Sequence, residues 1–263
     1  MRETQRADPS RGSLASTGRI TFVGHATVLL ELGGVRLLTD PVLRGRVAHL
    51  RRHGPRPEPP DRLDAVLVSH MHYDHLDLAS LRMVGSGRAE APRLIVPRGA
   101  GAFLRRKGFD GVDELAAGES AGVGDVEIRA APAEHDDRRR PLGPRADAIG
   151  FVITGARRVY FAGDTALFSG MCDLAPLELA LLPVAGWAPK MGPGHMDPHS
   201  AARAAARLRP RVAVPIHWGT FHPRWTRRGA WFSEPPHVFA AELAERAPEV
   251  EVRLLAPGES LEL

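Results

Sequence analysis

Residues 65–75 read AVLVSHMHYDH, and this stretch decides both the fold and the chemistry of the chain. The first four residues, Ala65 to Val68, form a short apolar run that predicts a buried strand. Because side chains two positions apart in extended chain point the same way, His70 and His72 face one side. Asp74 and His75 turn in beside them as the chain enters a helix. The sequence therefore predicts a site for one or two metal ions where this strand ends.

The ligand types limit the choice of metal without fixing it. Imidazole and carboxylate groups suit zinc, iron and manganese. The chain has 12 histidines and one cysteine, Cys172, which excludes a disulfide framework and an all-thiolate zinc site. We expect Cys172 to be a small core residue.

Further candidate ligands follow other predicted strands. His135 comes after the run 125–131, Asp164 after 158–162, and His217 after 211–216. A lone histidine in such a place is more commonly a capping or core residue. These positions are candidate metal ligands only in combination with the motif at 70–75. Together they predict a set of seven ligands: His70, His72, Asp74, His75, His135, Asp164 and His217.

The remaining pattern predicts many short strands with helices between them. Strands are expected at 20–23, 27–32, 35–39, 65–68, 93–96, 125–131, 148–153, 158–162, 179–182, 211–216 and 249–255. Helices are expected at 77–84, 99–107, 198–208 and 236–246, and residues 41–60 show no periodicity. Gly33-Gly34 predicts a two-residue hairpin turn. This order indicates an α+β fold of two packed sheets with helices on both outer faces, an αββα sandwich.

Length and hydropathy bound the organisation. The 263 residues suit a single domain over 19–263, preceded by a disordered N-terminal tail over 1–18. The tail lacks the apolar segment of a signal peptide. The most apolar stretch, residues 174–188, is interrupted by Pro176, Glu178 and Pro183 and is too short to span a bilayer. We therefore expect a cytoplasmic protein with no transmembrane segment.

The charge of the chain says little about partners. Its formal net charge is +4, and all but two of the 35 basic residues are arginine. The arginines occur in short clusters and form no long basic stripe with interleaved aromatic residues, so no nucleic-acid partner is expected.

The ordered series from His70 to His217 resembles the metallo-β-lactamase superfamily of dinuclear hydrolases. The segments around it are similar to the branch that contains N-acyl-phosphatidylethanolamine phospholipase D and, nearby, the ascorbate-6-phosphate lactonases. The resemblance extends from Arg19 to the C-terminus. The segments that carry it are residues 21–27 (TFVGHAT), 38–41 (LTDP), 65–76, 161–165 (FAGDT) and 216–221 (IHWGTF).

This resemblance implies a division of the ligands between two divalent cations, with Zn²⁺ expected first and Mn²⁺ or Fe²⁺ as alternatives. One cation would bind His70, His72 and His135, and the other Asp74, His75 and His217. Asp164 and a hydroxide would bridge them. Two such cations lower the pKa of bound water and stabilise charge on the attacked centre. Asp74, Asp164 and His195 are the implied catalytic residues.

Three further positions match family segments near the site. His195, in the segment 194–198 (GHMDP), would hold a phosphoryl oxygen or protonate the leaving group; the alternative is an exposed histidine in a capping loop. Asp40 would fix the tautomer of a metal-bound imidazole, unless it only starts a turn, and His25 would lie beside it.

The sequence does not fix the roles of the arginines in residues 41–60 or of the other histidines. Arg44, Arg46, Arg51 and Arg52 are candidates for binding a phosphate head group; the alternative is a solvated arginine-rich loop. We expect His49, His53, His222 and His237 at the surface.

The sequence thus favours a hydrolase acting on a phosphodiester, including a phospholipid, with a small-molecule or lipid-like anionic substrate. The alternatives are a lactone or carboxyl-ester hydrolase and a non-catalytic metal-binding module. Aromatic residues are only 6% of the chain, and acyl chains need a large apolar groove, which counts against a lipid. Homo-oligomerisation and membrane association stay open.

Overall fold

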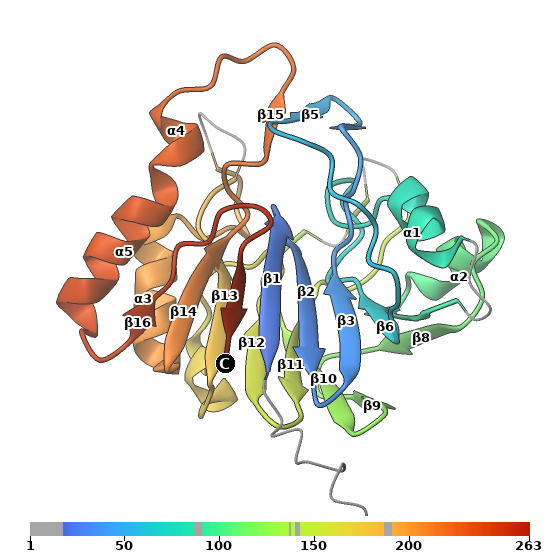
Figure 1. Ribbon diagram of the computed structural model, residues 1–263, viewed down its shortest axis with the longest axis horizontal. Coiled ribbons are helices and arrows are strands. Elements are labelled where there is room, and N and C mark those ends of the chain that lie inside the picture. The colour runs from blue at the N-terminus through green and yellow to red at the C-terminus, as the bar shows by residue number, and fades with distance from the viewer. Residues whose placement is uncertain (1–17, 87–90, 137, 140–142, 187–190) are drawn as a thin grey trace, which may run out of the picture.

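The computed structural model describes residues 18–86, 91–136, 138–139, 143–186 and 191–263. Apart from Gly18, the expected N-terminal tail lies outside these residues. Two seven-stranded sheets make up the centre of the structure (Figure 1). The first has the order β17 (Ser260–Glu262), β1 (Arg19–Gly24), β2 (Thr27–Leu32), β3 (Val35–Thr39), β6 (Ala65–Leu67), β7 (Arg93–Pro97) and β8 (Val112–Leu115). The second has the order β16 (Glu251–Val252), β14 (Val212–Ile216), β13 (Leu179–Pro183), β12 (Arg158–Phe161), β11 (Ile149–Thr154), β10 (Val126–Pro132) and β9 (Ser120–Val123).

The two sheets pack face to face, and their central strands are apolar on both sides. In β12, Val159 and Phe161 point into the core between the sheets, whereas Tyr160 points to the outer face. In β3, Leu37 joins the inner core and Leu38 the outer one. Because both faces of each sheet are covered, these strands read as nearly continuous apolar runs instead of alternating ones.

Helices cover the two outer faces (Figure 1). The first sheet packs against α1 (Leu78–Gly85) and α2 (Gly101–Arg106). The second sheet packs against α3 (Pro198–Leu208), α5 (Pro235–Arg246) and the 3-10 helix η1 (Ser169–Leu174). A one-turn helix, α4 (Ala230–Ser233), precedes α5. The predicted αββα sandwich is therefore confirmed.

Local sequence signals fix several of these boundaries. Helix α3 begins at Asp197, whose side chain accepts a hydrogen bond from the Ser200 backbone N–H, with Pro198 in its first turn. Such a cap replaces backbone partners that the first turn lacks. Gly33 and Gly34 both have positive φ, at 57° and 84°, as a tight hairpin between β2 and β3 requires.

Residues 41–60, expected to be irregular, contain two short strands. Strands β4 (Arg46–Val47) and β5 (Leu50–Arg52) form a third sheet with β15 (Phe221–Pro223), in the order β15-β5-β4. Val42, Val47, Leu50 and Phe221 form a small apolar cluster beneath it. The sequence missed this sheet because its strands have two or three residues and β5 pairs with a segment far along the chain.

Other expectations need correction. Strands β8, β9 and β17 were not expected, and β16 occupies only two residues of the predicted 249–255. Cys172 lies in η1 and is exposed, so its expected place in the core is wrong. Among the described residues, no helix is long and apolar enough to cross a membrane.

The sheets bring one set of strand ends to a common edge. Strands β3, β6 and β7 are mutually parallel, as are β12, β13 and β14. β1 and β10 run in the same direction as β3 and β12, because each is separated from it by one antiparallel strand. The segments that follow these strands therefore meet at one edge, and they carry the candidate ligands.

Candidate metal centre

The first group at this edge consists of three histidines. Nδ1 of His72 lies 3.0 Å from Nε2 of His70 and 3.0 Å from Nε2 of His135. His70 and His72 follow β6, and His135 follows β10 on the facing sheet. The ligand atoms of these residues lie within 4.8 Å of one another, close enough to bind one cation.

The hydrogen bonds around the first group leave ring nitrogens without protons. Nδ1 of His135 donates to the carbonyl oxygen of Gly194 at 2.7 Å. The Ser69 hydroxyl donates to Asp40 at 2.6 Å and so accepts from Nδ1 of His70 at 2.9 Å. Because a neutral imidazole carries one N–H, Nε2 of both His70 and His135 has no proton and offers a lone pair. Three nitrogens with at most one proton between them converge here, which suits a bound cation.

The second group contains Asp74, His75, His217 and His25. Nε2 of both His75 and His217 lies 3.6 Å from Oδ2 of Asp74, and Nε2 of His25 lies 3.1 Å from the same oxygen. Nδ1 of His75 donates to Asp40 at 2.7 Å, and Nδ1 of His217 donates to the carbonyl oxygen of Ala185 at 2.8 Å. These two bonds turn Nε2 of each ring toward the carboxylates.

Asp164, which follows β12, lies between the two groups. Its Oδ2 is 3.2 Å from Nε2 of His75 and 3.2 Å from Nε2 of His217. It also lies close to His135 of the first group and to His195. A carboxylate in this position can contact cations in both groups at once.

The protonation of the site differs between the two groups. Burial and neighbouring imidazoles hold the pKa of His70 well below its usual value, and burial lowers the pKa of His135 to about 4. Burial opposes charge on His217 as well, but Asp164 outweighs it and raises the pKa to about 9. Asp164, Asp74 and Asp40 raise the pKa of His75 well above its usual value in the same way. The carboxylates thus favour positive charge at the second group.

Two buried atoms support a cation between the groups. Nε2 of His75 and Oδ1 of Asp164 have no hydrogen-bond partner among the described residues. A buried polar atom without a partner costs free energy, and native proteins rarely leave one without a reason such as a bound ion. The donor set is all nitrogen and oxygen, as predicted, and fits zinc, manganese or iron.

A cavity of about 470 Å³ opens beside these groups. It is lined by His72, Asp74, Asp164 and His195. Nε2 of His195 lies 3.5 Å from Oδ2 of Asp164. The other lining residues of the cavity are Ala48, His49, Leu50, Tyr73, Asp136, Arg138 and Arg139. His195, expected either in the site or in an exposed capping loop, therefore faces the cavity with the candidate ligands.

None of the four arginines considered for phosphate binding lines this cavity. Arg44 donates to both carboxylate oxygens of Asp77, at 2.8 and 2.7 Å. Arg52 is buried, lies over the Phe221 ring and donates to the carbonyl oxygens of Arg44 and Val42. Arg46 and Arg51 are exposed on the small sheet. The role expected for these arginines at the metal site is therefore not supported by their positions.

Sequence reasoning missed Arg139, which holds the segment with the first candidate ligands in place. Its buried guanidinium donates to the carbonyl oxygens of Met71 and Leu76, at 2.7 and 3.0 Å. It also lies over the Tyr73 ring, 4.4 Å from the ring centre. These bonds tie together both ends of the segment that carries four candidate ligands. In the sequence Arg139 is one of three consecutive arginines, and nothing there distinguishes it.

Comparison with known proteins shows the family to which the chain belongs. The family described as the Beta-lactamase superfamily domain matches residues 35–218. A UPF0173 metal-dependent hydrolase of Methanopyrus kandleri is 33% identical over 253 residues, which cover 93% of this chain and 99% of the relative. Igni18, a metallo hydrolase of Ignicoccus hospitalis, has a TM-score of 0.71 and 25% identity, covering 94% of this chain and 99% of that one. The chain belongs to the beta-lactamase superfamily. Within it, the chain is one of the metal-dependent hydrolases.

Another relative has a lipid substrate in its name, and the match with it covers a smaller share of both chains. The N-acyl-phosphatidylethanolamine-hydrolyzing phospholipase D 1 of Caenorhabditis elegans is 34% identical over 233 residues. The match covers 76% of this chain and 64% of that relative. About a third of the relative thus has no counterpart in the match.

Proposed function

We propose that the chain is a dinuclear metal-dependent hydrolase that cleaves a small anionic substrate of the phosphodiester type. The position of Asp164 carries this proposal, because its carboxylate lies within 3.2 Å of His75 and His217 and close to His135 of the other group. His70, His72 and His135 would hold one divalent cation, and Asp74, His75 and His217 the second, with Asp164 shared. Two bound cations, Zn²⁺ first among them, would supply an activated water at neutral pH and stabilise charge on the attacked centre.

The side chains around the cavity determine how a substrate would be held. Arg138 and Arg139 line it, and among the described residues Asp136 is the one acidic lining residue apart from the candidate ligands. With two divalent cations bound, the cavity has net positive charge, which favours an anionic substrate. His195 lines the cavity beside Asp164. Its imidazole is placed to donate a proton to a leaving group or to hold a phosphoryl oxygen.

The size of the cavity supports a second candidate, a lactone or carboxyl-ester hydrolase with a phosphorylated substrate. A volume of about 470 Å³ is in the range of sites for small molecules. Few of the described residues that line it are aliphatic, and these are Ala48 and Leu50. Long acyl chains would have to leave the cavity, whereas a phosphorylated lactone fits inside it.

Elemental analysis and a substrate panel test the proposal together. The panel contains bis(p-nitrophenyl) phosphate, a glycerophosphodiester, an N-acyl-phosphatidylethanolamine, a γ-lactone and p-nitrophenyl acetate. We expect about two metal ions per chain and turnover of a phosphodiester that is lost in Asp164→Asn. The exposed Asp173→Asn is the matched control. Two bound metals with turnover of the lactone alone would favour the second candidate. Full metal loading without turnover of any substrate in the panel would instead favour a non-catalytic metal-binding module.

A further inference from the structure

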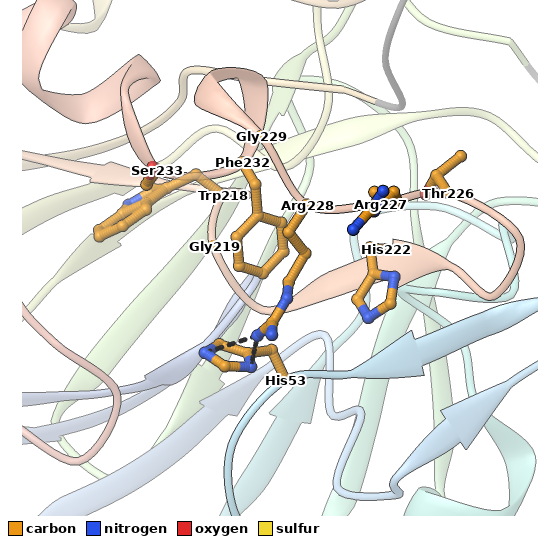
Figure 2. A pocket seen from close by; sticks show the side chains of 10 residues that line it. All are labelled: His53, Trp218, Gly219, His222, Thr226, Arg227, Arg228, Gly229, Phe232 and Ser233. Carbon is orange, nitrogen blue, oxygen red and sulfur yellow. Dashed lines mark hydrogen bonds between the residues drawn. The ribbon is translucent and has the colours of Figure 1, made fainter.

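A second pocket, separate from the candidate metal centre, lies beside the small sheet. It has a volume of about 730 Å³ and shares no lining residue with the cavity beside the histidines. Figure 2 shows its lining: His53, Trp218, Gly219, His222, Thr226, Arg227, Arg228, Gly229, Phe232 and Ser233. These residues follow β5, lie between β14 and β15, belong to β15, or lie in α4 and the segment that leads into it.

The formally charged side chains of this pocket are Arg227 and Arg228, and both are positive. His53, His222, Arg227 and Arg228 line it, and none of its ten lining residues is acidic. Nη1 of Arg228 lies 3.0 Å from Nε2 of His53 and also contacts Nδ1 of that ring, as the dashed lines in Figure 2 show. Neither Arg227 nor Arg228 forms an ion pair within the described part of the chain. Burial and the charge of Arg228 lower the pKa of His53.

The neighbouring sheet extends this positive surface. Arg46 of β4 lies directly opposite Arg51 of β5, and Arg51 lies opposite His222 of β15. Like charges in directly opposite positions destabilise a sheet. Arg46 and Arg51 are exposed and form no ion pair with any described residue, whereas Arg44 between β3 and β4 pairs with Asp77. No carboxylate among the described residues therefore offsets the repulsion between Arg46 and Arg51.

We propose that this pocket binds the phosphate group of a small phosphomonoester. Guanidinium groups bind phosphate oxygens through paired charge-assisted hydrogen bonds, and Arg228 and Arg227 stand at the pocket with His53 and His222. The volume exceeds what a phosphate ion fills, and Trp218 and Phe232 supply apolar surface for the rest of the ligand. Trp218 and Gly219 directly follow His217. The occupant thus contacts the segment that carries a candidate metal ligand. This site is additional to the proposed hydrolytic one.

Calorimetric titration of the metal-loaded enzyme tests the proposal. The probes are inorganic phosphate, glycerol 3-phosphate and phenyl phosphate, with phosphatidylcholine vesicles, with and without phosphatidic acid, as the membrane arm. We expect the soluble phosphates to bind, and Arg228→Gln to weaken that binding by about tenfold or more. Arg106→Gln is the matched control, because Arg106 is exposed on α2 and has no ion pair with a described residue. It should bind as the wild type does.

The metal centre can also attract phosphate, so a second variant separates the two sites. Asp164→Asn should keep the binding that Arg228→Gln loses. If Asp164→Asn loses binding while Arg228→Gln keeps it, phosphate occupies the metal centre and the proposal fails. It also fails if no soluble phosphate binds, or if only the vesicles with phosphatidic acid bind. None of these outcomes depends on which substrate the metal centre hydrolyses.

Discussion

Asp40 and His75 form a fully buried pair in which Nδ1 of the ring donates to Oδ2 of the carboxylate at 2.7 Å. The backbone N–H and the hydroxyl of Ser69 donate to the same carboxylate, at 2.7 and 2.6 Å. Asp40 thereby orients His75 directly and His70 through the Ser69 hydroxyl, one ring from each candidate metal group. Burial raises the pKa of Asp40, while the His75 ring and the Ser69 bonds oppose that rise.

Replacing Asp40 should weaken metal binding without removing a ligand. Asp40→Asn keeps the size of the side chain but loses the charge that holds the N–H of His75. We expect metal affinity to fall by about 10- to 100-fold, the usual effect of losing such a partner. Competition with a chelator measures it. Asp64→Asn, which alters a partly buried carboxylate that accepts from Arg36, is the control. Equal affinities in Asp40→Asn and wild type would mean that Asp40 only shapes the turn after β3.

Asp164→Asn should change both the metal content and the rate. The amide carries no charge and cannot bridge two cations as a carboxylate does. Elemental analysis should show about one metal per chain in place of two, and hydrolysis should fall by at least about 10³-fold. Asp173→Asn should keep both values. Two tightly bound metals with full activity in Asp164→Asn would refute a shared carboxylate.

The candidate ligands could be predicted from the sequence because each is defined locally. Four lie within six residues after one strand, and the others directly follow strands whose ends share one edge of a sheet. That edge depends only on strand direction, which the pattern of strands and helices already limits. The same holds for the αββα layers, since apolar runs with intervening helices have few ways to bury both faces.

Apart from the candidate ligands and His195, the lining of the two pockets could not be predicted, because it depends on contacts between distant segments. Arg139 donates to carbonyl oxygens 68 and 63 positions earlier in the chain. β5 finds its partner in β15 through pairs such as Arg52 and Phe221. No periodicity marks strands of two or three residues. For the same reason, the different environments of the loop arginines could not be predicted. Arg44 is ion-paired, Arg52 is buried, and Arg46 and Arg51 are exposed.

Arg139 should matter for both stability and metal binding. Arg139→Met fills similar space but leaves the carbonyl oxygens of Met71 and Leu76 without their donor. Losing hydrogen bonds to a charged group costs about 1.5–3 kcal/mol of unfolding free energy, and a looser segment should bind metal less tightly. Urea denaturation and chelator competition measure the two effects. Arg105→Gln, which breaks an exposed ion pair with Glu114, should stay within about 0.5 kcal/mol of wild type. A similarly small effect in Arg139→Met would argue against the structural role of Arg139.

The cap of α3 should show a defined pH dependence. Burial opposes ionisation of Asp197, but the hydrogen bonds from Ser200 outweigh it and lower the pKa of the carboxyl. A lowered folded-state pKa adds stability above the unfolded value, about 3.9, and this is lost as pH falls through the folded value. Asp197→Ala should therefore cost about 1 kcal/mol at neutral pH. Denaturation from pH 7 downward should show a constant difference that shrinks below about pH 4. A difference that persists unchanged in acid would show that the charge of Asp197 is not involved.

His195 should act on the leaving group, and substrates with different leaving groups can show it. Its Nε2 lies 3.5 Å from Oδ2 of Asp164, and both residues line the cavity. A proton donated by this ring would therefore reach a group that departs from the attacked centre. His195→Gln should keep about two metals and lower kcat by about 10²–10⁴-fold for a phosphodiester with an alkoxide leaving group. With p-nitrophenolate, which departs without a proton, the loss should be much smaller. An equal loss for both substrates would assign His195 to holding a phosphoryl oxygen, and a change in metal content would assign it to metal binding.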